Sequence, residues 1–265
     1  MKGKKICRTG FLAAAVLVIG WMEIARPVFS ADPTRNALLS TLISRILGAG
    51  AIFLLLSEMP ENPLLTVSPK KYAPLTLILA SLVSLNNGPW IGLLSGNAKV
   101  TGSAADILLL AGESLAVGLF EELAFRGLLF PVIREKFPGK TFRAAFVSSL
   151  IFAAVHLVNL AEGAPGAVIL QVGYSFLIGG MCSVILLEWG CVWLCALLHG
   201  VYNFGGALVP RLGEGTVWDP ATVTLTAVLG VIAAAVFVWV LWNLVREHYG
   251  IGKKKKDDKK EKTSE

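Results

Sequence analysis

Long apolar stretches alternate with short polar or Pro- and Gly-rich breaks along almost the whole chain. A bilayer core of about 30 Å requires roughly 20 apolar residues per helix, and about eight stretches approach that length. We therefore predict an all-α, polytopic membrane protein of about eight transmembrane helices, folded as a single transmembrane domain over residues 1–245. The predicted spans are residues 11–31, 36–57, 72–95, 105–130, 143–161, 164–187, 189–209 and 221–245.

Basic residues are distributed unequally between the two sides of this predicted bundle. The N-terminus, the connections near residues 70–71 and 134–143 and the tail at 246–265 fall on one side, and they contain most of the Lys and Arg. Since cytoplasmic loops carry the positive excess, we expect a multi-pass protein of the cell membrane with both termini in the cytoplasm. The tail should be a solvated basic segment without fixed structure. The basic residues expected on the opposite side are Arg26, Arg35, Lys99 and Arg211.

Residues 1–31 also fit a second interpretation. A basic start, the apolar run FLAAAVLVIG and small residues before Ala31 are typical of a cleaved secretory signal peptide. We favour an uncleaved first span, because Glu23 and Arg26 shorten the signal-like core and the apolar stretch is otherwise long enough to remain in the membrane. The orientation of the later spans is the same in either case.

The composition agrees with a membrane protein. Hydrophobic residues make up 55% of the 265 residues and charged residues only 16%, whereas soluble domains contain about 25% charged residues. Disordered, collagenous and disulfide-scaffold classes are thereby excluded. Much of the net charge of +6 comes from the tail, so it indicates orientation and not a nucleic-acid partner. The four Cys form no CxxC pair, and we interpret them as small core residues.

A few ionisable residues remain at membrane depth once the loops are set aside. Charged groups are expensive in hydrocarbon, so each of them should face the bundle interior with a partner or a function. The spacing does not decide whether Glu113 and Arg45 form an interhelical pair or a second polar patch. The residues at membrane depth are Arg45, Glu113, Glu121, Glu122, Arg126, His156 and His199.

Helical spacing separates the roles of these side chains. Glu122 and Arg126 are four residues apart, with the acid first, which is the favourable order for a structural ion pair. Glu121 points about 100° away from Glu122 around the helix and is left free to act. His199 and Asn203 share one face. The three motifs that contain these residues are EELAFR at 121–126, FAAVH at 152–156 and HGVYN at 199–203.

A carboxylate, two imidazoles and an amide that converge in a water-accessible cavity are the components of a hydrolytic site. Glu121 could act as general base on a water molecule, while Asn203 and a His stabilise the oxyanion. Equally, Glu121, His156 and His199 could bind a divalent metal such as zinc and leave a position open for water. Either arrangement would hydrolyse a peptide bond. The chain contains neither the HExxH motif of zinc proteases nor a Gly-x-Gly-Asp motif.

The three motifs together resemble those of the CPBP family of intramembrane proteases, also called the Abi or type II CAAX prenyl endopeptidase family. That family carries EExxxR, FxxxH and HxxxN in this order on separate transmembrane helices, and this chain departs from the pattern at no motif position. The likeness covers a motif-bearing core at about residues 105–209. Each motif alone is a weak signal, but three in order on apolar spans are a strong one.

The resemblance implies an eight-helix, all-α membrane endopeptidase whose cavity is reached from the cytoplasm and the bilayer. Its substrate would be a membrane-associated peptide or a lipidated protein, in CAAX processing, peptide maturation or bacteriocin self-immunity. Family analogy assigns water activation to Glu121 with His156, and oxyanion stabilisation to His199 with Asn203. The resemblance does not decide whether a metal is required.

Two other classes of function use similar residues. The same cavity could bind a partner peptide without cleaving it, as a membrane scaffold. Buried Glu and His residues on several helices are also found in proton-coupled transporters. We consider a transporter less consistent with the sequence, because the acids cluster on one helix and no inverted repeat is visible.

Overall fold

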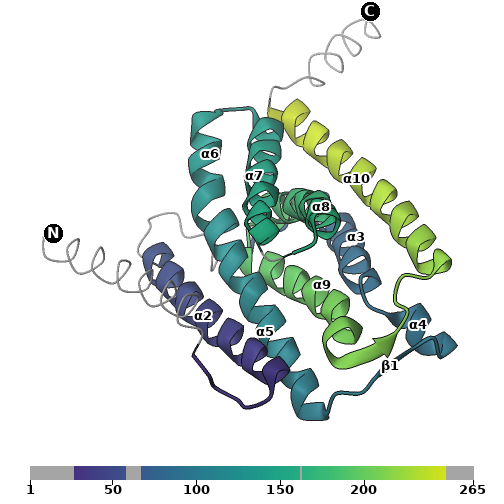
Figure 1. Ribbon diagram of the computed structural model, residues 1–265. Helices are drawn as coiled ribbons and strands as arrows, with labels where there is room; N and C mark the ends of the chain where they lie inside the picture. The colour runs from purple at the N-terminus through teal and green to yellow at the C-terminus, as the bar shows by residue number, and fades with distance from the viewer. Residues whose placement is uncertain (1–26, 58–66, 162, 249–265) are drawn as a thin grey trace, which may run out of the picture.

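The computed structural model describes residues 27–57, 67–161 and 163–248 (Figure 1). Most of the predicted span 11–31, with its signal-peptide alternative, and most of the predicted tail at 246–265 lie outside the described residues. The helical elements are α2 (Pro33–Leu56), α3 (Ala73–Asn86), α4 (Trp90–Ser95), α5 (Ala104–Glu122), the π-helix η1 (Leu123–Leu129), α6 (Phe130–Lys136), α7 (Thr141–Val155), the 3-10 helix η2 (His156–Ala161), α8 (Pro165–Trp189), α9 (Val192–Leu212) and α10 (Pro220–His248).

Five of the described helical segments are long and apolar enough to cross a membrane. They support the prediction of an all-α polytopic membrane protein, whereas the predicted number of about eight spans is not confirmed. Two short strands, β1 (Ala98–Val100) and β2 (Gly213–Gly215), pair antiparallel at one end of the bundle. The five segments are Pro33–Leu56, Thr141–Ala161, Pro165–Trp189, Val192–Leu212 and Pro220–Arg246.

The prediction of one span at residues 72–95 is wrong. α3 ends at Asn86, and the short α4 begins only after Pro89. Proline cannot donate a backbone hydrogen bond and disfavours a helical conformation in the preceding residue, so the helix is interrupted at Gly88 and Pro89. At this interruption α9 packs closely against the backbone of Gly88. A Cβ built on Gly205 of α9 would lie only 2.8 Å from the Gly88 nitrogen, so a larger residue would not fit there.

The predicted span 105–130 corresponds to α5 and η1, and α6 continues the same helical run. α5 begins at a capping box, in which Ser103 accepts a hydrogen bond from the Asp106 backbone and Asp106 accepts one from the Ser103 backbone. The acids along α5, including Glu113 and Glu121, interrupt its apolar sequence. These acids explain why α5 is not one of the five segments that are long and apolar enough to cross a membrane.

Small residues let α5 and α9 approach closely, and these two helices share the most extensive contact in the bundle. A Cβ on Gly118 would lie 2.7 Å from the Ala196 carbonyl oxygen, and a Cβ on Gly200 would lie 2.8 Å from the Leu115 side chain. Glycine at such a crossing permits backbone contact between membrane helices. The crossing brings the first and third sequence motifs together.

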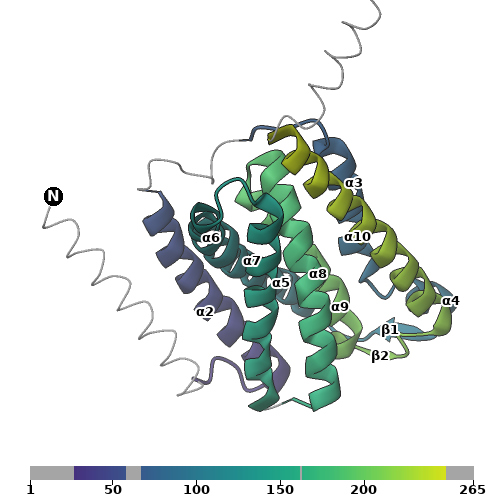
Figure 2. The ribbon, with the colours of Figure 1, turned by 90° about the horizontal axis from the view of Figure 1, so that it is seen from above.

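The remaining helices surround this pair. α7 and α8 pack against each other along their lengths, and α2 packs against α5. α3 and α10 form a layer on the opposite side of α8 and α9 from α2 (Figure 2). The motif-bearing helices therefore lie in the interior of the bundle, and the layer of α3 and α10 covers one side of them.

Candidate active site

The four residues predicted to be catalytic line one polar cavity of about 400 Å³. Glu121 comes from the last turn of α5, His156 from the start of η2, and His199 and Asn203 from successive turns of α9. The sequence indicated that these residues could come together. It did not predict which helices lie next to one another, so it could not show that they do. The other side chains around this catalytic cavity are Val117, Phe152, Gln171, Tyr174, Ser175, Ile178 and Tyr202.

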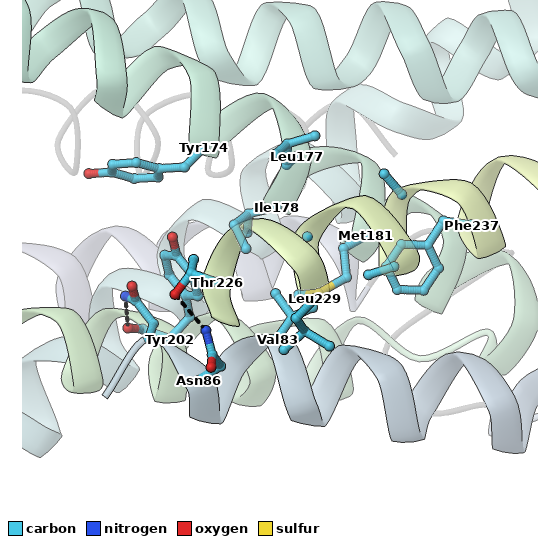
Figure 3. Close-up of a pocket in the computed structure, with 14 residues that line it drawn as sticks. Val83, Asn86, Tyr174, Leu177, Ile178, Met181, Tyr202, Thr226, Leu229 and Phe237 are labelled. Carbon is cyan, nitrogen blue, oxygen red and sulfur yellow. Dashed lines mark hydrogen bonds between the residues drawn. The ribbon is translucent and has the colours of Figure 1, made fainter. Parts of the chain in front are cut away.

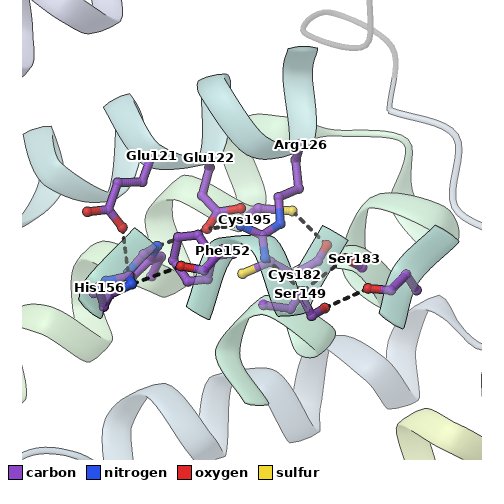
Figure 4. Close-up of polar contacts among 12 residues, drawn as sticks. Glu121, Glu122, Arg126, Ser149, Phe152, His156, Cys182, Ser183 and Cys195 are labelled. Carbon is purple, nitrogen blue, oxygen red and sulfur yellow. Dashed lines mark hydrogen bonds and ion pairs between the residues drawn. The ribbon is translucent and has the colours of Figure 1, made fainter. Parts of the chain in front are cut away.

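The two adjacent glutamates of the first motif have different environments (Figure 4). The Glu121 side chain is 21% exposed and borders the cavity, whereas the Glu122 side chain is fully buried. Glu122 Oε1 lies 3.1 Å from Arg126 Nη1, and the guanidinium also donates from Nη2 to the Gly179 carbonyl oxygen at 2.7 Å. The structure thus brings the predicted ion pair together and leaves Glu121 accessible to a water molecule.

Glu122 has a second partner, on another helix, that the sequence does not predict. The same Oε1 atom accepts a hydrogen bond from His199 Nδ1 at 2.9 Å, between helices α5 and α9. A carboxylate that holds one imidazole nitrogen fixes the orientation of the ring. Glu122 therefore positions the His of the third motif. Only the helix crossing reveals this contact, since the two residues are 77 positions apart.

Both cavity histidines are bound through Nδ1. His156 Nδ1 lies 2.9 Å from the Phe152 carbonyl oxygen, which can only accept, so Nδ1 carries the proton. In the neutral ring, His156 Nε2 then has a free lone pair. His199 Nδ1 likewise donates to Glu122, and His199 Nε2 lies 3.7 Å from Glu121 Oε2. Each ring thus keeps Nε2 for a proton or a hydrogen bond.

Phe152 packs at the centre of the site. Its ring meets His156 and His199 edge-on, with centroid distances of 5.1 and 5.8 Å. The Arg126 guanidinium lies over the same ring at 4.6 Å, and Phe125 packs against it edge-on. The spacing of the FAAVH motif places Phe152 one helical turn before His156, whereas the contacts of Phe152 with His199 and Arg126 depend on the packing of the helices. The fully buried ring lines the polar cavity and also contacts the Arg126 guanidinium, which it stabilises through a cation-π contact.

A π-helix follows directly after the two glutamates. η1 replaces regular α-helix over Leu123–Leu129 and includes Arg126. Wide helical turns of this kind are rare and occur frequently at functional sites. Sequence periodicity of 3.6 residues cannot distinguish such a turn from ordinary helix, so this element was not predicted.

The structure does not bring together the predicted zinc ligands Glu121, His156 and His199 as one compact set of donors. Within the described residues, the group of three ligand atoms that lie within 4.8 Å of one another comes from Glu122, Cys182 and Cys195. These could hold a metal ion by spacing. However, Glu122 Oε1 already binds Arg126 and His199, and neither thiol borders the catalytic cavity. This second set therefore does not fit a metal that activates water there.

The other buried acid of α5 lies outside the catalytic cavity. Glu113 Oε1 accepts a hydrogen bond from Arg211 Nη1 at 2.9 Å. This ion-pair partner lies on α9, whereas the guanidinium of Arg45 lies 5.3 Å from the centre of the Phe120 ring. Arg211, expected in a loop, belongs to the last turn of α9. We assign Glu113 and Arg211 to the packing of α5 against α9.

The comparison with protein families agrees with the motifs. Residues 103–205 match the family profile described as "Type II CAAX prenyl endopeptidase Rce1-like". The match covers α5 to most of α9 and includes every residue of the three motifs, so it confirms the resemblance recognised from the sequence. The family is one of membrane proteases, which are hydrolases. No curated protein and no solved structure matches the chain.

Proposed function

We propose that this membrane protein, whose residues 103–205 match the Rce1-like family, is an intramembrane endopeptidase that cleaves a membrane-associated peptide or a lipidated protein. The observation that carries the proposal is the catalytic cavity, in which Glu121, His156, His199 and Asn203 line one polar space between helices. A carboxylate, two correctly bound imidazoles and an amide provide a base and oxyanion donors, as peptide hydrolysis requires.

Glu121 is the proposed general base. It is the accessible acid of the pair, and its carboxylate takes a proton from water as the water oxygen attacks the carbonyl carbon of the peptide. His156 accepts a hydrogen bond from the same water at Nε2, because its Nδ1 proton is held by Phe152. When the C–N bond breaks, Glu121 returns the proton to the leaving amine. The products are a carboxylic acid and an amine.

His199 and Asn203 are the proposed oxyanion donors. His199 lies between the carboxylates of Glu121 and Glu122, and Arg126 pairs with Glu122 as a fixed positive charge. A protonated His199 makes the net charge of these four groups zero and gives Nε2 a proton to donate. Asn203 lies one helical turn further along α9 and lines the same cavity, so its amide N–H can donate to the same oxygen.

The proposal is tested by comparing peptide termini in membranes from cells that express wild-type protein or Glu121→Gln at matched levels. We expect a set of new termini that disappears with Glu121→Gln. Glu135→Gln provides the matched control, because Glu135 is an exposed acid of α6 away from the cavity. If a phenotype persists in Glu121→Gln and the termini are identical, the protein is a scaffold and not a protease.

A further inference from the structure

A second cavity adjoins the catalytic one and is chemically different from it. It contains about 650 Å³ of space, part of it open to the surroundings, within the range of pockets that hold small ligands. α3, α8 and α10 form most of its wall, which is largely apolar (Figure 3). We call this space the apolar chamber.

The apolar chamber and the catalytic cavity share part of their walls. Tyr174, Ile178 and Tyr202 line both spaces. The rings of Tyr174 and Tyr202 are tilted against each other, with their centroids 6.0 Å apart. Only side chains that border both spaces therefore stand between a group in the chamber and a peptide bond held in the catalytic cavity.

Small residues of α10 leave the chamber open. Gly230, Ala233 and Ala234 line it, and a Cβ built on Gly230 would meet no atom within 4 Å. Both α3 and α10 lie outside residues 103–205, the segment that matches the family. The matched segment thus supplies the catalytic residues, whereas other parts of the chain complete the chamber. This division is expected if the chamber selects substrates for this particular protein.

The chamber is not uniformly apolar. Asn86 donates from Nδ2 to Thr226 Oγ1 at 2.8 Å, which links α3 to α10 across the wall (Figure 3). The other amide atom, Asn86 Oδ1, accepts no hydrogen bond from the residues that the structure describes. A hydrocarbon chain would cover this oxygen without a hydrogen bond, which is unfavourable, whereas a peptide backbone can donate an N–H to it. The wall therefore fits a peptide segment better than an alkyl chain.

We propose that the apolar chamber is the specificity pocket of the endopeptidase and binds a bulky apolar residue of the substrate beside the cleaved bond. This inference rests on the proposed function. Asn86 binds the substrate backbone, and Gly230 sets the size of the side chain that the chamber accepts.

Binding is tested without cleavage, in Glu121→Gln protein purified in detergent. The probe is an acetylated and amidated octapeptide of Ala and Ser with one diazirine analogue of leucine, and a diazirine fatty acid is compared with it. We expect the peptide to crosslink to residues 226–237 of α10 and the crosslinks to be lost in a Gly230→Leu background. If only the fatty acid crosslinks there, the chamber is a lipid site and the proposal is overturned.

Selectivity is tested with peptides that span a cleaved sequence found by the comparison of termini. The residue beside the cleaved bond is varied from Ala to Leu to Phe. We expect Gly230→Leu to lower kcat/KM for the Phe peptide by roughly 10- to 200-fold relative to the Ala peptide, as for other apolar pockets that lose space for a methylene or more. Equal effects on all three peptides would contradict a specificity pocket.

Gly173→Leu is the matched control. Gly173 is an exposed glycine of α8 whose Cβ would also meet no atom within 4 Å, and it lines neither cavity. The same substitution there should leave the selectivity unchanged.

The proposed pocket and the proposed endopeptidase activity can fail separately. Crosslinks on α10 without any termini that depend on Glu121 would refute the endopeptidase. Termini that depend on Glu121 without crosslinks on α10 would refute the pocket.

Discussion

The two cavities of this protein differ in how the chain builds them. The catalytic cavity lies where α5 and α9 touch through glycines, and its charged groups are fixed by partners on other helices. The apolar chamber lies beside Gly230 of α10, where an added Cβ would meet no atom within 4 Å. In the function we propose, close packing positions the reactive groups, whereas unfilled space admits a substrate. The same residue type, glycine, serves opposite purposes in the two regions.

The largest expected effect is the loss of the base from the catalytic cavity. Glu121→Gln should lower the cleavage rate by about 10²- to 10⁴-fold, since the amide cannot take the proton from water. His156→Ala should act in the same direction. Glu121→Gln should be recovered in detergent at wild-type amounts, because the Glu121 carboxylate is partly exposed and its contact with His199 Nε2 is long, at 3.7 Å. A Glu121→Gln protein with full activity towards an identified substrate would show that another residue is the base.

Removal of the buried cation should affect folding before chemistry. Arg126→Ala leaves the Glu122 carboxylate buried without its guanidinium, and breaking a buried ion pair costs about 3–5 kcal/mol. We expect much less folded protein, measured by size-exclusion chromatography in detergent and by thermal unfolding. Arg134→Ala is the control, because Arg134 is exposed at the end of α6.

Glu122→Gln separates the two roles of Glu122. The amide oxygen can still accept from His199, but the charge that pairs with Arg126 is lost. If Glu122 served the ion pair alone, all remaining folded protein would have normal turnover. We expect the folded fraction to be reduced and its turnover to be lower as well, because the neutral amide no longer favours a protonated His199.

Truncation of the amide in the third motif should affect the reaction alone. Asn203→Ala should lower kcat by about 10²- to 10³-fold, as for other oxyanion donors, with little change in KM. Asn159→Ala is the control, because Asn159 is an exposed amide that contacts Gln171 at the edge of the site. A rise in KM at constant kcat in Asn203→Ala would assign Asn203 to substrate binding in place of oxyanion stabilisation.

The sequence predicted the class of fold and the residues at the catalytic cavity, because both depend on local signals. Apolar length indicates membrane helices, and spacing within a helix indicates which side chains share a face. The motif residues Glu121, His156, His199 and Asn203 could therefore be chosen before their arrangement was known. Pro89 could also have indicated the break between α3 and α4.

Contacts between helices could not be predicted in the same way. The bond from His199 to Glu122, the pairing of Glu113 with Arg211 and the convergence of Cys182 with Cys195 all depend on crossings that no local pattern encodes. The apolar chamber was missed for the same reason. Its residues read as ordinary apolar helix, and only the space between α3, α8 and α10 distinguishes them.

The smallest effects are expected from replacing one glycine by alanine in each of the two regions. These two substitutions also test the contrast between the regions most directly. A methyl group on Gly118 meets the Ala196 carbonyl oxygen at 2.7 Å and the Gly200 nitrogen at 2.8 Å, which are backbone atoms that cannot move aside independently. Gly118→Ala should therefore destabilise the protein by about 1–3 kcal/mol, as overpacking does in other cores. It should also lower activity, since it separates Glu122 from His199.

Gly230→Ala adds the same methyl group to open space. Alanine favours the helical conformation over glycine by about 0.8–1.0 kcal/mol, so this variant should unfold at the same or a slightly higher temperature than the wild type. Thermal unfolding of both variants in one detergent gives the comparison. If Gly230→Ala were destabilised as much as Gly118→Ala, the space beside α10 would be filled in the folded protein. The chamber could then not admit a substrate, and the division between a packed catalytic region and an open binding region would fail.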